Sequence, residues 1–466
     1  MNNQSFIKKQ DFDKNTSLDK LYILGILLIL SVYAFFFLKV SSGFGPYYGD
    51  EVFYQKNSES YFQSKELRAS FTYSGKGSKI GAFDAHGPSY PIIYGTALKL
   101  GIPESMHIPL VNYFLFFIAI LLLVWQNRRQ PYKFLQVILI LGSPYTLFYA
   151  FSFMPELIHL AIAIGLYLLL TRYLKEFSRW NLVVLILGIF LAGLIRSTWF
   201  FTLLALGFYF LPKKIWFGIS LSLVGLVSAF LYASFFHEQT PTVFSNAISF
   251  LKSGEFGSSF HEIYFNTKRN IYFFLTYSEG KYYWGWKIWV LVSLALGIGF
   301  LKRNQLIRIS TYLLLIQLIF SIVLYKTYEW TDWRMLSSVT ILLNLGIIEY
   351  HPFKLRSKLM VGISLLSFLL ILPFQHKVIS LRNDYTPTPI GSEIISNLKD
   401  LNHALVRVDS SLLADYDLES LPTINFEGKL IRYILPYYSV EEVPASHFLE
   451  KQENQLMIRS VKILPQ

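Results

Sequence analysis

The chain has 466 residues, of which 53% are hydrophobic and 15% are charged, and its formal net charge is +12. This hydrophobic content excludes an ordinary soluble domain. The positive charge does not indicate nucleic acid, because most lysines and arginines stand in short segments between apolar runs, where they set orientation and meet anionic headgroups. The absence of cysteine excludes disulfides, thiol catalysis and thiolate metal sites.

The first apolar run covers residues 21–40 and is long enough to cross a bilayer. About twenty polar residues precede it and no small-residue cleavage site follows, so we interpret it as a retained helix rather than a secretory signal. The sequence predicts a polytopic α-helical membrane protein with about eleven transmembrane helices. The later runs begin near Pro109, Phe134, Pro155, Leu182, Trp199, Ile215, Trp286, Leu306, Leu336 and Leu359.

Basic clusters mark alternate connections between these runs. If the clusters and the basic N-terminus face the cytoplasm, an odd number of crossings places the C-terminus on the extracytoplasmic side. The stretch 182–211 fits one tilted helix or two short ones. Positive charge at both of its ends, Arg179 and Lys213, favours two helices that turn at Arg196 near the outer surface.

Three segments lack the composition of a membrane span. Residues 41–108 form a predicted first outer loop and residues 237–283 a second one, both within a transmembrane domain that covers residues 1–374. Residues 375–466 form a tail with a mixed pattern. Its segment 392–398 is typical of a helix, and segments 404–408, 430–435 and 455–463 are typical of strands, which together predict a small α/β domain outside the membrane.

The acidic pair Asp50-Glu51 stands about ten residues after the first apolar run. Two carboxylates at a membrane surface are costly, yet they can accept a proton from a hydroxyl group or balance charge beside a phosphate. A structural explanation is also available. Asp50 suits the N-cap of a predicted helix over residues 51–67, and Glu51 suits the positive end of that helix dipole.

A second motif in the first outer loop contains Asp84 and His86, followed by Gly87 and Pro88. Glycine and proline fix a loop conformation, so the Asp84 and His86 side chains are expected to project close to each other. His86 is able to donate to a phosphate oxygen or to shuttle a proton. An exposed or structural loop histidine is the alternative.

An acidic pair after the first transmembrane helix, an amphipathic outer-loop helix and a proline-containing motif before re-entry resemble the GT-C superfamily of membrane glycosyltransferases. The similarity is greatest to the branch that holds protein O-mannosyltransferases and lipid A aminoarabinose transferases. That branch commonly has a Lys-Pro-Pro-like motif, whereas this chain has His86-Gly87-Pro88. The resemblance extends, more weakly, over about residues 20–350.

Three further residues belong to the resemblance. Glu156 follows Met154-Pro155 in a segment similar to the link between the third and fourth helices of such enzymes, although an acid in a first helical turn also favours the helix dipole. Arg196, amid apolar residues, needs a phosphate, a carboxylate or a route to the headgroups. Arg334 ends a segment similar to a late-loop motif and suits phosphate, but pairing with Asp332 or Glu329 explains it equally well.

The resemblance implies an inverting transferase of the bacterial cytoplasmic membrane that uses a polyprenyl-phosphate sugar as donor. Asp50 or Glu51 would act as general base on a hydroxyl of a glycan, lipid or protein acceptor at the outer face. The residues expected to bind donor or phosphate are His86, Asp84, Arg196, Arg334 and Glu156. No metal or other cofactor is required, although two acids and a histidine are able to ligate a divalent cation.

Three other functions are compatible with parts of the sequence. A transporter of lipid-linked sugars would favour charged or broken helices at the membrane midplane and symmetric halves, which the sequence does not have. An O-antigen polymerase or ligase would place its main functional loop late in the chain, where residues 237–283 fit. A structural or binding membrane protein is the remaining alternative.

Overall fold

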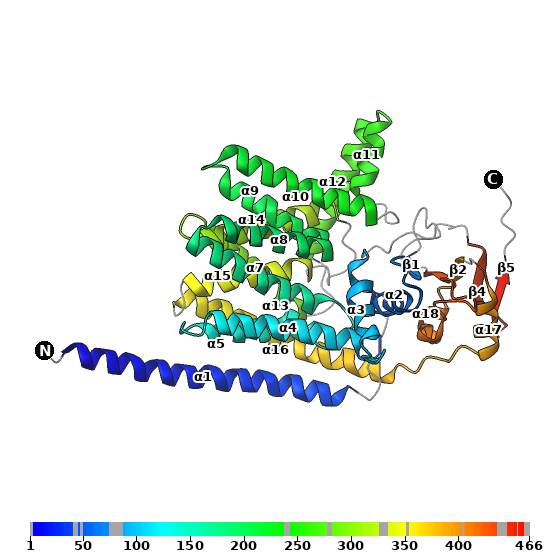
Figure 1. Cartoon of the computed structure of the whole chain (residues 1–466), viewed down its shortest axis with the longest axis horizontal. Coiled ribbons are helices and arrows are strands. Elements are labelled where there is room, and N and C mark those ends of the chain that lie inside the picture. The colour runs from blue at the N-terminus through cyan, green and yellow to red at the C-terminus, as the bar shows by residue number, and fades with distance from the viewer. Residues whose placement is uncertain are drawn as a thin grey trace.

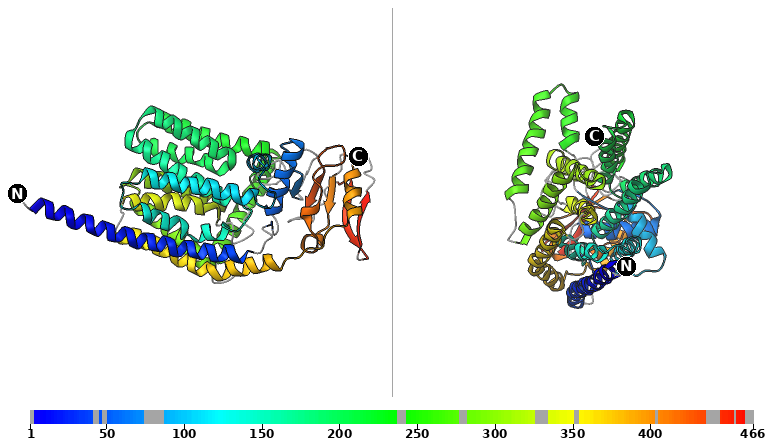
Figure 2. Two further views of the ribbon diagram at one scale, coloured as in Figure 1. Left: turned by 60° about the horizontal axis from the view of Figure 1, so that its bottom comes forward. Right: turned by 90° about the vertical axis from the view of Figure 1, so that its left-hand side faces the viewer.

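The computed structural model describes residues 3–40, 45–46, 50–73, 87–236, 243–276, 282–325, 334–350, 354–402, 405–435, 445–453 and 455–460. Long helices run side by side in one bundle, and a small sheet lies beyond one end of it (Figure 1). The N-terminal end of α1 and the sheet lie at opposite ends of the molecule (Figure 2).

Seven of the described helices are long and apolar enough to cross a membrane. They are residues Asp19–Lys39 of α1 (Asn3–Lys39), α4 (His107–Gln126), α7 (Glu156–Glu176), α10 (Ile215–Phe236), residues Tyr283–Phe300 of α13 (Tyr282–Phe300), α14 (Gln305–Val323) and α16 (Leu355–Asp384). Buried residues from most of the bundle helices form one continuous apolar cluster. The chain is therefore a multi-pass α-helical membrane protein.

The other four predicted apolar runs lie on shorter helices. These are α5 (Lys133–Leu141), α8 (Arg179–Ile195), α9 (Phe201–Phe210) and α15 (Arg334–Tyr350). The preference for two helices within residues 182–211 is confirmed. The α8 helix ends at Ile195, Arg196 has extended backbone angles, and the short 3₁₀ helix η1 (Ser197–Phe200) leads into α9.

A five-stranded sheet combines two distant parts of the chain in the order β1-β3-β2-β4-β5. The strands are β1 (Phe71–Tyr73), β2 (Leu405–Val408), β3 (Arg432–Leu435), β4 (His447–Gln452) and β5 (Gln455–Ser460). The edge strand β1 belongs to the first outer loop and pairs in parallel with β3. Strands β2, β3 and β5 lie within the three segments predicted as strands, and α17 (Ser392–Asp400) covers the predicted helix.

The first outer loop joins the bundle to the sheet. Its helices α2 (Asp50–Ser64) and α3 (Ser89–Lys99) lie between the two (Figures 1 and 2). Most of α2 is buried, and the Arg432 Nε of β3 donates to the Ala69 carbonyl at 2.7 Å. The boundary drawn at residues 374 and 375 falls inside α16, which continues to Asp384 before the chain enters the sheet region.

Five further described elements complete the fold. A short helix, α6 (Pro144–Tyr149), precedes α7, and α11 (Val243–Lys252) packs against α12 (Phe256–Thr276) within the predicted second outer loop. In the sheet region, α18 (Leu412–Asp415) is followed by the 3₁₀ helix η3 (Leu418–Ser420).

Glycines allow α9 and α10 to approach closely. A Cβ on Gly207 would lie 2.6 Å from the Gly218 carbonyl oxygen, and a Cβ on Gly218 would lie 2.8 Å from the Gly207 carbonyl oxygen. A Cβ on Gly225 would lie 2.9 Å from the Phe200 carbonyl oxygen. Small residues at such a contact stabilise helix packing in lipid, where apolar burial gives little advantage.

We expect Gly207→Leu to separate α9 from α10 and to lower the thermal midpoint of the detergent-solubilised protein, because overpacking costs about 1–3 kcal/mol. The matched control is Gly299→Leu on α13, where an added Cβ meets no atom within 4 Å. Size-exclusion chromatography after a heating series measures both variants. Equal thermal midpoints for the two variants would contradict the close packing.

A half-buried carboxyl, that of Glu419, lies at the joint between the sheet region and α2. Burial raises the pKa of Glu419 from 4.5 to about 7, and the nearby Asp417 carboxylate adds to this rise. Lys56 lowers the pKa of Glu419, whereas Glu59 and Glu51 of α2 raise it. The folded chain therefore binds this proton more tightly than the unfolded chain does, and this contribution to stability falls as the pH rises from about 4.5 to 7.

Replacement of Glu419 by Gln should remove this pH dependence. The variant should gain about 1 kcal/mol over the native chain near pH 8, after allowance for solvent screening, and much less near pH 5. Thermal unfolding at the two pH values measures the difference, with the exposed Glu393→Gln as control. A Glu419→Gln variant that follows the native pH profile would refute a raised pKa.

Candidate functional site

The two carboxylates of the acidic pair have different partners. Asp50 Oδ2 lies 3.2 Å from Nη2 of Arg334 at the start of α15, and their side chains are 23% and 19% exposed. Glu51 accepts from Arg382 Nη2 at 2.9 and 3.0 Å and from the Phe153 backbone N–H at 3.2 Å. Glu51 and Arg382 are 9% and 8% exposed. Asp50 is thus the more accessible acid of the pair.

Arg382 holds the start of the first outer loop against the last long helix. Besides Glu51, it donates to the Gly45 carbonyl oxygen at 3.2 Å. It stands in the last turn of α16, within the segment assigned from the sequence to the tail. Sequence reasoning therefore missed this residue. The only signal was a lone arginine close to the end of the final apolar run.

Glu156 begins α7 and lies close to the same cations. Its Oε1 is 3.8 Å from Arg334 Nε, and only 2% of its side chain is exposed. It also interacts electrostatically with Arg196 and Asp50. Its second oxygen, Oε2, is buried and accepts no hydrogen bond from the described part of the chain. One oxygen of this carboxylate is therefore without a hydrogen bond among the described residues.

Arg196 is a second group with unused hydrogen-bonding capacity. Its guanidinium makes no hydrogen bond and no ion pair within 4.0 Å among the residues that the structure describes. Its electrostatic neighbours are Tyr90, Glu156, Arg334 and Tyr145. The expectation that Arg196 needs a counter-charge is therefore met only through a more distant interaction with Glu156.

Tyrosines surround the charged groups. Tyr90 and Tyr145 are buried, and the Tyr145 hydroxyl has no hydrogen-bond partner in the described ranges. Burial raises the pKa of Tyr90, so this phenol stays protonated. Sequence reasoning did not select these tyrosines, because 31 tyrosines are spread along the chain and none has a distinctive spacing.

A buried histidine orients Tyr90. The Trp199 indole N–H donates to His159 Nδ1 at 3.2 Å, and His159 Nε2 lies 2.9 Å from the Tyr90 hydroxyl oxygen. Because an indole N–H is only a donor, Nδ1 must carry the lone pair and Nε2 the hydrogen. Nε2–H therefore donates to the Tyr90 oxygen, and the Tyr90 hydroxyl hydrogen is directed to another acceptor.

The structure brings Asp50, Glu156, Arg334 and Arg196 into one cluster, with Glu51 next to it. Asp84 and His86 lie outside the described residues, as do Glu329 and Asp332. In the described part of the chain, no group of three His, Asp or Glu residues is arranged to hold a metal ion. We call Asp50, Glu156, Arg196 and Arg334 the charged cluster.

The chain matches no protein-family model and no curated protein.

The burial of Glu51 predicts a difference in stability between the two acids. We expect Glu51→Gln to lower the free energy of unfolding by about 3 kcal/mol, because it leaves the buried Arg382 without its counter-charge. Asp50→Asn is the matched control and should cost less than about 1 kcal/mol, because its ion pair is more exposed. Thermal unfolding in detergent measures both. Equal losses of stability in the two variants would contradict the expectation that the buried Glu51 contributes more to stability than Asp50 does.

Proposed function

We propose that the chain is an inverting glycosyltransferase, which moves a sugar from a polyprenyl-phosphate donor to an acceptor hydroxyl at the outer face of the cytoplasmic membrane. In this proposal eleven apolar helices cross a bacterial membrane, the N-terminus is cytoplasmic and the sheet is extracytoplasmic. The observation that carries the proposal is an accessible carboxylate, Asp50, in one cluster with the arginines Arg334 and Arg196.

The reaction needs a base that can exchange its proton with water. Asp50 suits this role better than Glu51, because its side chain is more exposed. Glu51 accepts from Arg382 and from the Phe153 backbone, and taking a proton would weaken these bonds. In the proposed step, Asp50 removes the acceptor proton as the hydroxyl oxygen attacks the anomeric carbon.

The departing lipid phosphate needs cations that are already in place. The guanidinium of Arg196 is not engaged in an ion pair with any described carboxylate, so a phosphate would meet donors that need no rearrangement. Guanidinium groups bind phosphate through two parallel hydrogen bonds, which also fix its orientation. Tyr90 supplies a further hydroxyl donor close to Arg196, because His159 already donates to its oxygen.

Glu156 has a separate role in this proposal. Its Oε1 restrains Arg334, while the buried Oε2 is left to accept a hydrogen bond. Buried polar atoms are normally paired, so an unpaired oxygen beside the charged cluster favours a ligand rich in hydroxyl groups. We assign Oε2 as an acceptor for a hydroxyl of the donor sugar. No metal ion is needed for these steps.

The carrier lipid must reach the cluster from the bilayer. Helix α12 has large apolar and aromatic side chains that remain exposed, among them Phe260, Tyr264 and Tyr272. Polar residues lie on other positions of the same helix, as is typical of a helix at a membrane interface. An amphipathic pair, α11 and α12, beside the bundle is consistent with a protein that handles a lipid substrate.

We expect Asp50→Asn to lower the rate of sugar transfer by about 10²–10⁴-fold, because a general base contributes a factor of this size, while its loss of stability stays below about 1 kcal/mol. The assay measures release of polyprenyl phosphate from labelled polyprenyl-phosphate sugars by purified protein in lipid nanodiscs. Glu156→Gln should also lose activity. Its control is Glu176→Gln at the opposite end of the same helix, where the side chain is 59% exposed. Near-native transfer by Asp50→Asn would exclude Asp50 as the base.

A further inference from the structure

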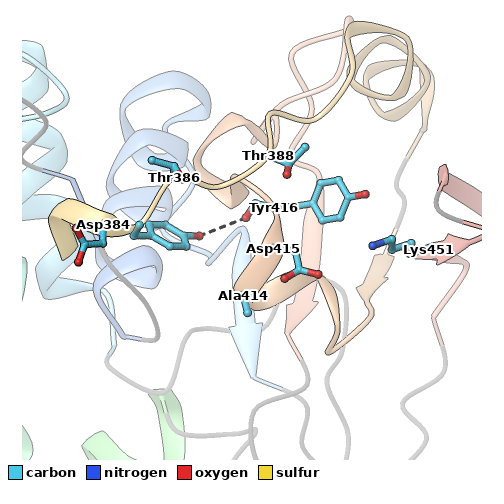
Figure 3. A pocket seen from close by; sticks show the side chains of 8 residues that line it. Asp384, Thr386, Thr388, Ala414, Asp415, Tyr416 and Lys451 are labelled. Atoms are coloured by element: carbon cyan, nitrogen blue, oxygen red, sulfur yellow. Dashed lines mark hydrogen bonds between the residues drawn. The ribbon is translucent and has the colours of Figure 1, made fainter. Parts of the chain in front are cut away.

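A polar cavity of 410 Å³ lies where α16 leaves the bundle and meets the sheet region (Figure 3). One wall comes from Asp384 at the end of α16 and from Thr386 and Thr388 in the segment that follows it. The other comes from the end of α18 and from β4, with Asp415, Tyr416 and Lys451. Its volume lies within the range of about 300–1,000 Å³ that is typical of small-molecule sites.

Backbone hydrogen bonds hold the two walls together. The Thr388 N–H donates to the Asp415 carbonyl oxygen at 2.8 Å, and the Asp417 N–H donates to the Thr388 carbonyl oxygen at 2.9 Å. Thr388 and Tyr416 form a parallel β-bridge, and the Tyr385 hydroxyl donates to the Tyr416 carbonyl oxygen at 3.4 Å. The cavity is therefore preformed, which reduces the entropy that a ligand would have to lose on binding.

The lining favours a neutral ligand with many hydroxyl groups. The carboxylates of Asp384 and Asp415 outnumber the ammonium of Lys451, so the net charge of the lining is negative and disfavours phosphate. Most of the lining is polar, which disfavours an acyl chain. The carboxylates accept hydrogen bonds, Lys451 and the threonines donate them, and the ring of Tyr416 offers a flat apolar face. Lys451 Nζ lies 6.0 Å from the centroid of that ring and points toward it (Figure 3).

We infer that this cavity binds a saccharide, and, resting on the proposed function, that this saccharide is the remote part of the acceptor. Asp384 stands two residues after Arg382 in the last turn of α16, an axial separation of about 3 Å. Arg382 binds Glu51, which is adjacent to Asp50 in the chain. The last turn of α16 thus contributes both to the cavity, through Asp384, and to the ion pair with Glu51, through Arg382, and we assign the cavity to a part of the acceptor remote from the reacting hydroxyl.

The test uses the full-length protein in lipid nanodiscs on an array of immobilised neutral, acidic and amino oligosaccharides. We expect the native chain to retain at least one saccharide, and Asp50→Asn to retain it equally. The double variant Asp384→Asn/Asp415→Asn should lose at least tenfold in affinity, while the control Asp400→Asn, an exposed acid on α17, should not. Lys451→Ala, an exposed substitution, provides a second cavity variant if the double variant does not fold.

The transfer assay separates this inference from the proposed function. The cavity variants should raise the KM for the acceptor about tenfold and change kcat less than twofold, since the cavity binds acceptor without touching the reacting atoms. The inference is overturned if the native chain retains no saccharide, or if the cavity variants retain a saccharide as well as the native chain does. Neither result contradicts the proposed sugar transfer. Saccharide binding without transfer from any polyprenyl-phosphate sugar supports the cavity and rejects the proposed function.

Discussion

The buried ion pair between Arg382 and Glu51 is the contact on which the arrangement of the charged cluster depends. It joins the end of α16 to the start of α2, and the Phe153 N–H joins the same carboxylate to the segment before α7. Three parts of the chain therefore meet at one side chain. Burial of two ions is costly, and the attraction compensates only when further hydrogen bonds satisfy them, as the Phe153 N–H and the Gly45 carbonyl oxygen do here.

Fixing Glu51 also fixes Asp50, because the two residues are adjacent in the first turn of one helix. The same loop continues into β1, which pairs with β3 of the C-terminal part of the chain. The bundle and the sheet are thus linked both by α16 and by the first outer loop.

The sequence was sufficient for features that depend on local pattern. Continuous apolar runs predicted the helices, a charged residue with flanking basic residues predicted the break at Arg196, and alternating segments predicted β2, β3 and β5. It was not sufficient for features that depend on contacts between distant residues. The pairing of Arg382 with Glu51 spans more than 300 positions, and the orientation of Tyr90 by His159 involves helices that no periodicity relates. Which of two adjacent acids is buried likewise depends on the partners that tertiary packing supplies.

The described acids and arginines in and beside the charged cluster are equal in number. Asp50, Glu51 and Glu156 lie near Arg196, Arg334 and Arg382. Two close ion pairs leave Arg196 and one oxygen of Glu156 without a hydrogen bond among the described residues. A phosphate would bind the Arg196 guanidinium, and a sugar hydroxyl would donate to that oxygen of Glu156. Both of these ligand groups belong to the same proposed donor. Binding of such a donor would therefore also stabilise the fold, since a ligand that binds only the folded state raises its stability.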